Sequence, residues 1–178
     1  MFLDLTKLDE RGRLEERFEI GPDHEVLDGF RAEVREPLVL DAELVNPSGR
    51  TYVLNARLSG IAFAPCRRCL TPVGIPIDHQ FRVVYQEPPR GEEPEGEDDE
   101  DAIAWIDRGA TKIEIDRAVR DRLFLESERF PLCDEECAGL CPVCGVDRNE
   151  EDCDCVVETV DARWQALEEF RSEMGESS

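Results

Sequence analysis

Apolar and polar residues alternate along much of residues 38–86, and this period of two is typical of strands with one side in a core. The clearest case is TYVLNARL, in which four apolar side chains take alternate positions: Tyr52, Leu54, Ala56 and Leu58. The preceding stretch, LVLDAELVN, is separated from it by the turn sequence NPSG at 46–49. A third stretch, IDHQFRVVYQ, follows Pro72. We therefore predict an antiparallel meander, with Cys66 and Cys69 at one of its turns.

Shorter elements are predicted outside the meander. The apolar runs FLDL, RFEI, AIAWID and TKIEID indicate short extended segments or turns near the N-terminus and after residue 101. Apolar residues at helical spacing predict a helix from about Arg117 to Arg129, with Asp116 as its N-cap. A second helix is predicted from Val160 to about Met174. The fold class is therefore α+β: a small antiparallel β-sheet with two helices and a cysteine-rich C-terminal region.

Acidic residues dominate the composition. The 178 residues include 43 Asp and Glu against 21 Lys and Arg, a formal net charge of −22. Clustered basic residues drive non-specific binding to nucleic acid, and this chain has no long run of them, so broad affinity of that kind is disfavoured. A basic partner such as a ribosomal protein suits the charge better. The bland alternative is that the acidic surface serves solubility alone.

One acidic segment divides the chain. EPPRGEEPEGEDDED, at 87–101, combines proline, glycine and like charges, which is typical of a disordered loop. It separates an N-terminal β-sheet region, 1–86, from residues 102–178, which hold the helical segments and six of the eight cysteines. We expect the region 102–178 to pack with the sheet as one domain.

The eight cysteines form four close pairs: Cys66/Cys69, Cys133/Cys137, Cys141/Cys144 and Cys153/Cys155. Two pairs, CRRC and CPVC, have the C-x₂-C spacing that wraps a tetrahedral ion, and four thiolates per ion make a closed structural Zn²⁺ site. The N-terminal sequence has no signal-peptide pattern and no apolar run is long enough to span a membrane, so we expect a cytoplasmic protein with reduced thiols. The cysteines would then form two Cys₄ zinc sites with none left over.

Four pairs can be divided between two metal sites in three ways. The sequential division places Cys66, Cys69, Cys133 and Cys137 in one site and Cys141, Cys144, Cys153 and Cys155 in the other. We favour it because its second site closes a loop of only 15 residues, at a small cost in entropy. An interleaved and a nested division are the alternatives.

Other chemistry remains possible for these thiols. An iron–sulfur cluster also accepts four thiolates. A thioredoxin-like redox pair is disfavoured, because Cys66 follows a strand and Thr71-Pro72 leads into another rather than into a helix. Three arginines lie among the cysteines, Arg67, Arg68 and Arg148, and would offset the negative charge of the metal–thiolate sites. Their alternative role is contact with RNA phosphates.

The sequence indicates a protein that is not an enzyme. H-E-x-x-H, G-x-S-x-G, P-loop and G-x-G-x-x-G motifs are absent. His79 lies in a strand segment and is expected at a surface or an edge, while Trp105 and Trp164 are expected in the core. Aromatic and basic residues are not interleaved, which disfavours a general binder of single strands. We therefore predict no catalytic residue and no small-molecule substrate.

Two motifs carry a resemblance to a known family. CRRCL at 66–70, after a long strand, and FPLCDEECAGLCPVCGVDRN at 130–149, after a helix, resemble the YceD family of large ribosomal RNA subunit accumulation proteins. The resemblance covers roughly residues 15–155 and includes the order of elements. The family commonly continues as Asn-Leu-Asn after the CPxCG motif, whereas this chain has Asp147-Arg148-Asn149.

The resemblance implies a function in ribosome biogenesis. Members are bacterial cytoplasmic proteins, also found in plastids, that are needed for normal levels of large-subunit (23S) ribosomal RNA. We expect a zinc-stabilised, non-catalytic adaptor whose partner is a large ribosomal subunit precursor, through a ribosomal protein or a protein–RNA intermediate. A direct rRNA-binding zinc protein, with the three arginines as contacts, is the alternative. Neither reading involves a membrane.

Overall fold

The computed structural model describes residues 1–88, 103–127 and 130–156. The chain forms two compact units. The first, here called the sheet unit, comprises Met1–Cys66 and Pro72–Pro131, and the second, the cysteine unit, comprises Arg67–Thr71 and Leu132–Ser178.

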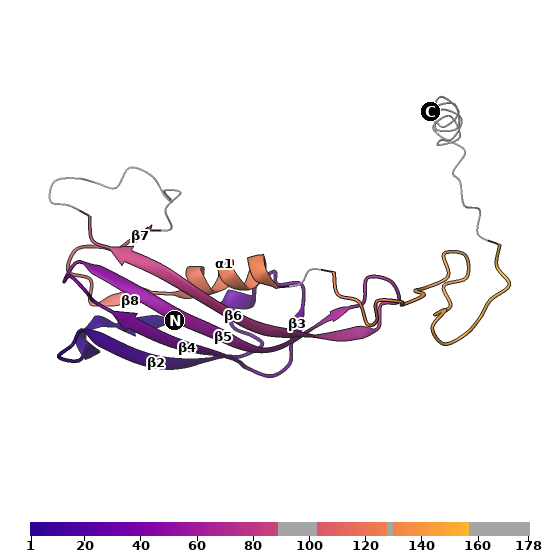
Figure 1. Cartoon of the computed structure of the whole chain (residues 1–178), viewed down its shortest axis with the longest axis horizontal. Coiled ribbons are helices and arrows are strands. Elements are labelled where there is room, and N and C mark those ends of the chain that lie inside the picture. Colours follow the sequence, from indigo (N-terminus) through magenta and orange to yellow (C-terminus); the bar gives the residue numbers. More distant parts are fainter. Residues whose placement is uncertain (89–102, 128–129, 157–178) are drawn as a thin grey trace, which may run out of the picture. The chain divides into compact units, whose positions relative to one another are not determined.

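The sheet unit is built on a six-stranded sheet (Figure 1). Its main path runs through β2 (Arg13–Ile20), β4 (Leu38–Val45), β5 (Thr51–Pro65), β6 (Pro72–Gln86) and β7 (Ile103–Trp105). The short strand β3 (Glu33–Val34) pairs with β5 off this path. The meander predicted from the alternating pattern is confirmed as β4, β5 and β6, and Cys66 and Cys69 lie at the turn between the last two. Strand β7 differs from the rest, because it pairs with β6 in parallel.

The apolar positions of the alternating pattern share one face of the sheet. Leu40 lies opposite Leu58 across β4 and β5, and the same row continues to Phe18 on β2 and His79 on β6. The most deeply buried members, each fully inaccessible to solvent, are Leu38, Leu40, Leu44, Leu54 and Leu58. Burial of such side chains contributes roughly 1.5–3 kcal/mol each, so this face supplies most of the stability of the unit.

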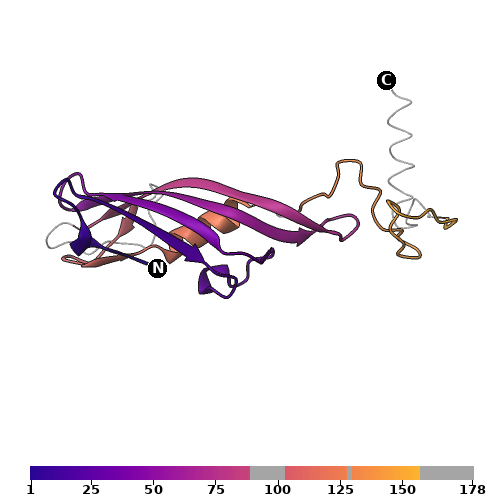
Figure 2. The same cartoon turned by 90° about the horizontal axis from the view of Figure 1, so that it is seen from below.

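Short elements cover the buried face. Strand β1 (Phe2–Asp4) pairs antiparallel with β8 (Lys112–Glu114), and the helix α1 (Asp116–Glu126) runs along the sheet, as Figure 2 shows. Two 3₁₀ turns, η1 (Leu5–Lys7) and η2 (Glu25–Leu27), complete the order of elements. The four extended segments predicted outside the meander are thus confirmed, as β1, β2, β7 and β8.

The helix begins and ends differently from the prediction. Its N-cap residue is Ile115, which makes no side-chain cap, and Asp116 instead pairs with the amino group of Met1. It ends at Glu126 rather than near Arg129, because Ser127 turns to an extended conformation. A carboxylate in the first turn still interacts favourably with the helix dipole.

The predicted second helix, the acidic segment and the two tryptophans were also expected from the sequence. The described residues hold one α-helix, and the second predicted helix, 160–174, lies outside them together with Trp164. Most of the acidic segment 87–101 also lies outside the described residues. Trp105 was expected in the core and this is wrong: it is 36% exposed, because it ends the edge strand β7.

None of the described helices has the length and apolar character needed to cross a bilayer.

Candidate metal centres

The eight cysteines, all within the described ranges, gather into two groups of four. Cys66, Cys69, Cys133 and Cys137 form the first cluster, and Cys141, Cys144, Cys153 and Cys155 form the second. Within each cluster the four sulfur atoms lie within 4.8 Å of one another, and no disulfide is formed. This grouping agrees with the sequential division favoured from the sequence and not with the interleaved or nested alternatives.

The donor set of each cluster fits a tetrahedral metal ion. Four sulfurs at about 2.3 Å from one Zn²⁺ would lie roughly 3.8 Å apart, close to the spacing found. Cys69 Sγ and Cys133 Sγ are 3.5 Å apart. The clusters differ in exposure: Cys66, Cys69 and Cys137 are buried in the first, whereas Cys141 alone is buried in the second. Both clusters could hold a metal ion, and the first would shield it better from solvent.

Each C-x₂-C pair closes a tight turn, here called a knuckle. In the second knuckle, the N–H of Gly145 donates to the carbonyl oxygen of Cys141 at 2.8 Å. Gly145 has φ +78°, a left-handed conformation that costs glycine nothing. The residue at the same position of the first knuckle is Leu70, with φ 65°, and its side chain is 60% exposed. The two knuckles therefore share a backbone shape, but the first reaches it with a strained and exposed leucine.

Backbone donors and neighbouring thiols set the acidity of the second cluster. The N–H groups of Cys144 and Val143 donate to Cys141 Sγ and lower the pKa of that thiol to about 6. The hydrogen bond with Cys144 raises the pKa of Cys155 to about 12. Cys141 therefore ionises easily, whereas Cys155 resists ionisation beside it. A divalent cation would offset the repulsion between their negative charges.

A small hairpin joins segments of the two clusters. Leu140 and Asp147 form a β-bridge, the Cys141 N–H donates to Val146 O at 2.8 Å, and the Arg148 N–H donates to Gly139 O at 3.0 Å. The second knuckle lies at the tip of this hairpin and Cys137 lies at its base. Both clusters thus take cysteines from one short, hydrogen-bonded segment.

Arg68 forms hydrogen bonds with the backbone of the segment that carries Cys137. Its guanidinium donates to Cys137 O at 2.8 Å and to Glu135 O at 3.1 Å, and its own carbonyl accepts the Leu140 N–H at 2.9 Å. All three arginines, Arg67, Arg68 and Arg148, are exposed. Of the three arginines singled out in the sequence, Arg68 therefore has a defined structural role, which is to position the backbone beside Cys137.

Asn149 is a residue to which the sequence analysis gave no role. Its Nδ2 donates to Cys137 Sγ at 3.4 Å and its Oδ1 accepts the Ala138 N–H at 2.8 Å. Asp147 Oδ1 accepts from both the Asn149 backbone N–H and Nδ2, at 2.9 Å and 2.6 Å. A sequence signal did exist: an Asp-x-Asn sequence, typical of a turn, begins at Asp147, separated from Gly145 only by Val146. Asp147 and Asn149 together shape the environment of one thiol of the first cluster.

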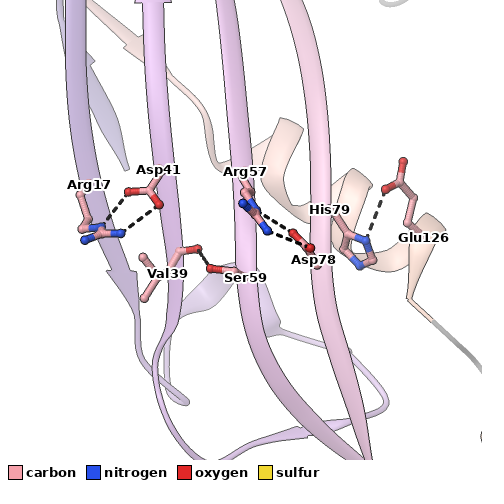
Figure 3. Close-up of polar contacts among 8 residues, drawn as sticks. All are labelled: Arg17, Val39, Asp41, Arg57, Ser59, Asp78, His79 and Glu126. Atoms are coloured by element: carbon pink, nitrogen blue, oxygen red, sulfur yellow. Dashed lines mark hydrogen bonds and ion pairs between the residues drawn. The ribbon is translucent and has the colours of Figure 1, made fainter.

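A second polar group lies in the sheet unit, at the end of α1 (Figure 3). His79 was expected at a surface or edge, and its burial corrects that: it is 9% exposed, with Nε2 3.2 Å from Ser127 Oγ and Nδ1 3.4 Å from Glu126 Oε2. His79 lies two residues from both Ile77 and Phe81 on the strand, so its side chain is on the same, buried face, and the sequence contained this signal.

The order hydroxyl, imidazole, carboxylate is that of hydrolase triads, but Ser127 is buried at the C-terminal end of a helix, where the dipole disfavours a developing anion. We assign the group to anchoring the helix end.

The opposite face of the sheet carries a shallow, charged depression. Its lining includes Glu15, Arg17, Asp41, Glu43, Arg57 and Arg82. Arg17 forms a two-bond pair with Asp41, at 2.7 and 3.0 Å, and Arg57 forms another with Asp78, at 2.7 and 2.9 Å (Figure 3). These guanidinium bonds lower the pKa of both aspartates below their ordinary values. Two of its arginines are thus already paired, so the depression offers little net positive charge to a polyanion.

Comparison with known proteins gives one family match and several relatives. The profile of the family described as "Large ribosomal RNA subunit accumulation protein YceD" matches residues 54–171. "Large ribosomal RNA subunit accumulation protein YCED homolog 1, chloroplastic" of Zea mays is 28% identical over 176 residues, covering 85% of this chain and 59% of the relative. The protein of the same name in Arabidopsis thaliana is 32% identical over 132 residues, 61% of this chain and 41% of the relative.

A bacterial relative is also found. An uncharacterized protein of Mycobacterium tuberculosis is 30% identical over 118 residues, 64% of this chain and 54% of the relative. The chain therefore spans about half the length of these curated relatives. No solved structure gives a significant match.

Proposed function

The chain belongs to the YceD family, and from this membership we propose that it supports the accumulation of large-subunit (23S) ribosomal RNA. The proposed mode of action is that of a non-catalytic adaptor. It would hold a ribosomal protein, or a protein–RNA assembly intermediate, through acidic surface around two metal centres. We propose the cytoplasm as its compartment, because eight cysteines without disulfides suit a reducing environment.

The charge of the cysteine unit is the observation that carries the adaptor hypothesis. Its described residues include eight acids against three arginines, and seven of the acids are exposed: Asp134, Glu135, Glu136, Glu150, Glu151, Asp152 and Asp154. Each Zn²⁺ bound by four thiolates would add about two more negative charges. Fields of one sign attract partners of the other and accelerate their encounter, so the unit suits a basic ribosomal protein.

Zinc is the metal we propose for both clusters. Four thiolates around one ion, with one pair of each cluster held in a tight knuckle, are the ligand set of structural zinc sites. Such a site has no open coordination position for a substrate, which is consistent with a non-catalytic role. The two ions would cross-link the chain and offset part of the thiolate charge, while the protein supplies all eight ligands.

Direct rRNA binding is a weaker proposal. Arg68, one of its three candidate contacts, already uses its guanidinium on Cys137 O and Glu135 O. Arg67 and Arg148 are exposed and would face RNA amid a majority of carboxylates. Such a surface gives little of the counterion release that drives binding to a polyanion.

A crosslinked pull-down of the tagged chain from growing cells, with and without RNase, tests the proposal. Three forms are compared: the unaltered chain, the triple variant Glu150→Lys/Glu151→Lys/Asp152→Lys, and the matched variant Glu10→Lys/Glu19→Lys/Glu36→Lys. The second triple makes the same change in net charge at exposed residues of the sheet unit. 23S rRNA is quantified in the same strains.

The adaptor hypothesis expects ribosomal proteins to persist after RNase and to be lost selectively with the first triple variant, with a fall in 23S rRNA. Loss of every partner with the RNA, together with sensitivity to Arg67→Ala/Arg148→Ala, would instead support direct RNA binding. Unchanged 23S rRNA in cells lacking the protein would contradict both.

A further inference from the structure

We propose that Asn149 couples the two cysteine clusters, so that a metal ion in one cluster raises the affinity of the other for its own ion. Asn149 would act as a positioning residue for the thiolate of Cys137. This inference rests on the proposed metal binding and adds to it an energetic link between the sites.

The contacts of Asn149 cross from one cluster to the other. The residue lies on the segment between Cys144 and Cys153, two ligands of the second cluster. Its side chain, however, contacts Cys137 Sγ, a ligand of the first cluster, at 3.4 Å, and the N–H of Ala138 at 2.8 Å. A change in the path of the second-cluster loop would therefore move a group that contacts a first-cluster ligand.

The orientation of the side-chain amide is determined by its neighbours. The Ala138 N–H is a donor and needs the amide oxygen, so Nδ2 must face the sulfur. Asp147 Oδ1 then accepts from Nδ2 at 2.6 Å and from the Asn149 backbone N–H at 2.9 Å, which holds the side chain in place. Nδ2 is thereby directed at the sulfur that would bind the metal ion, and this contact holds the sulfur in position.

The hairpin provides the path between the sites. Leu140 bridges Asp147, and the Arg148 N–H donates to Gly139 O at 3.0 Å, so residues on both sides of the second knuckle are fixed to each other. An ion in the second cluster would hold Cys141 and Cys144 against Cys153 and Cys155 and would keep this hairpin closed. Closing the hairpin sets Asn149 beside Cys137, and this reduces the ordering that the first ion must impose.

The test is a competitive Zn²⁺ titration of the full chain, with native mass spectrometry to count bound ions. The affinity of the first cluster is measured twice: with the second cluster loaded, and with it disabled by Cys153→Ser/Cys155→Ser, changes that lie outside the hairpin. The ratio of the two affinities is the coupling factor. We expect a factor on the order of 5–150 in the unaltered chain.

Two variants of Asn149 identify the residue responsible. Asn149→Ala removes all three side-chain contacts, while Asn149→Asp retains an oxygen for the Ala138 N–H and removes the Nδ2 donor to Cys137 Sγ and to Asp147 Oδ1. Both are expected to weaken the first cluster by roughly 10–100-fold and to bring the coupling factor close to one. Arg148→Ala is the control, since that exposed neighbour contributes to the hairpin through its backbone, and it should retain the coupling.

Three outcomes would overturn the inference. A factor near one in the unaltered chain means that the sites are independent, although zinc binding itself would stand. A factor that persists in both Asn149 variants assigns the coupling to the hairpin backbone instead. Failure of the unaltered chain to bind any zinc would refute the metal centres as well.

Discussion

The sheet unit and the cysteine unit hold their folds together by different means. The sheet unit buries a continuous apolar face under α1 and the β1–β8 pair. In the described part of the cysteine unit, the buried residues are three cysteines, Cys69, Cys137 and Cys141, and one glycine, Gly139. The sheet unit therefore has a hydrophobic core, whereas the described part of the cysteine unit is held by backbone hydrogen bonds around cysteine sulfurs that could bind metal ions. A chain of this composition can be stable in one part without any ligand and depend on a ligand in the other.

Removal of metal should produce the largest difference in stability between the two units. Binding of structural zinc is worth about 10–16 kcal/mol in zinc-finger peptides. Because the described residues of the cysteine unit bury no apolar side chain other than cysteine, most of that would be folding free energy there. We expect a strong chelator to abolish hydrogen-exchange protection at the amides of Leu140, Cys141 and Gly145 while β4 and β5 remain protected. Equal loss in both units, or in neither, would show that their stabilities do not differ in the way proposed.

Truncation of a core leucine should destabilise the sheet unit and leave the cysteine unit unaffected. Leu54 is fully buried on β5, so Leu54→Ala is expected to destabilise the sheet unit by about 2–5 kcal/mol through lost burial and a cavity. The zinc content should not change. Leu125→Ala is the control, because Leu125 is 70% exposed on α1 and should shift stability by less than about 0.5 kcal/mol. Denaturant unfolding and metal analysis on the same samples measure both quantities.

Loss of the polar anchor at the end of α1 is expected to cost less. His79→Ala removes the partner of the buried Ser127 hydroxyl, and an unsatisfied buried group costs about 1–3 kcal/mol. Gln80→Ala, at the next and exposed position of β6, serves as the control. Faster hydrogen exchange in the last turn of α1 should accompany the loss. If His79→Ala and Gln80→Ala unfold at the same denaturant concentration, the anchoring role is wrong.

The two knuckles allow a prediction in the stabilising direction. Leu70 holds a left-handed conformation that costs a leucine roughly 1–2 kcal/mol and costs glycine almost nothing. Leu70→Gly should therefore tighten zinc binding by the first cluster, or leave it unchanged where the flexibility of glycine in the unfolded chain offsets the gain. Gly145→Leu, the reverse change in the second knuckle, should weaken zinc binding. Weaker binding in Leu70→Gly would mean that the leucine side chain itself supports the site.

The smallest expected effect concerns the exposed ion pairs of the sheet. The Arg17 hydrogen bonds lower the pKa of Asp41 below its ordinary value of 3.8, so the folded state binds the proton less readily than the unfolded state. The stabilisation is therefore fully present above pH 3.8 and is lost as the pH falls through the lowered pKa of the folded state. Unfolding curves of Asp41→Asn and the unaltered chain should differ slightly at pH 7 and converge in acid. A difference that grows in acid would contradict the sign of this shift.

The cysteine clusters illustrate how far sequence reasoning extends. Four close pairs in the sequence predicted two sets of four ligands, and the short loop from Cys141 to Cys155 favoured the division that the structure has. Closure of a short loop is a local property, so the sequence contains it. The contact of Asn149 with Cys137 depends on the turn that folds residues 146–149 back along 138–141, and no spacing in the sequence specifies which sulfur that side chain meets.

By itself the sequence determined the strands β4, β5 and β6, because apolar and polar residues alternate along them with a period of two. It also determined the acidic character of the chain and the pairing of its thiols. Only the tertiary structure decided that His79 is buried, that Asp116 meets the amino group of Met1 rather than capping α1, and that β7 runs parallel to β6. Each of those features joins residues far apart in the chain, or depends on what covers a strand. Periodicity reports which side chains share a face, whereas only long-range packing determines what that face meets.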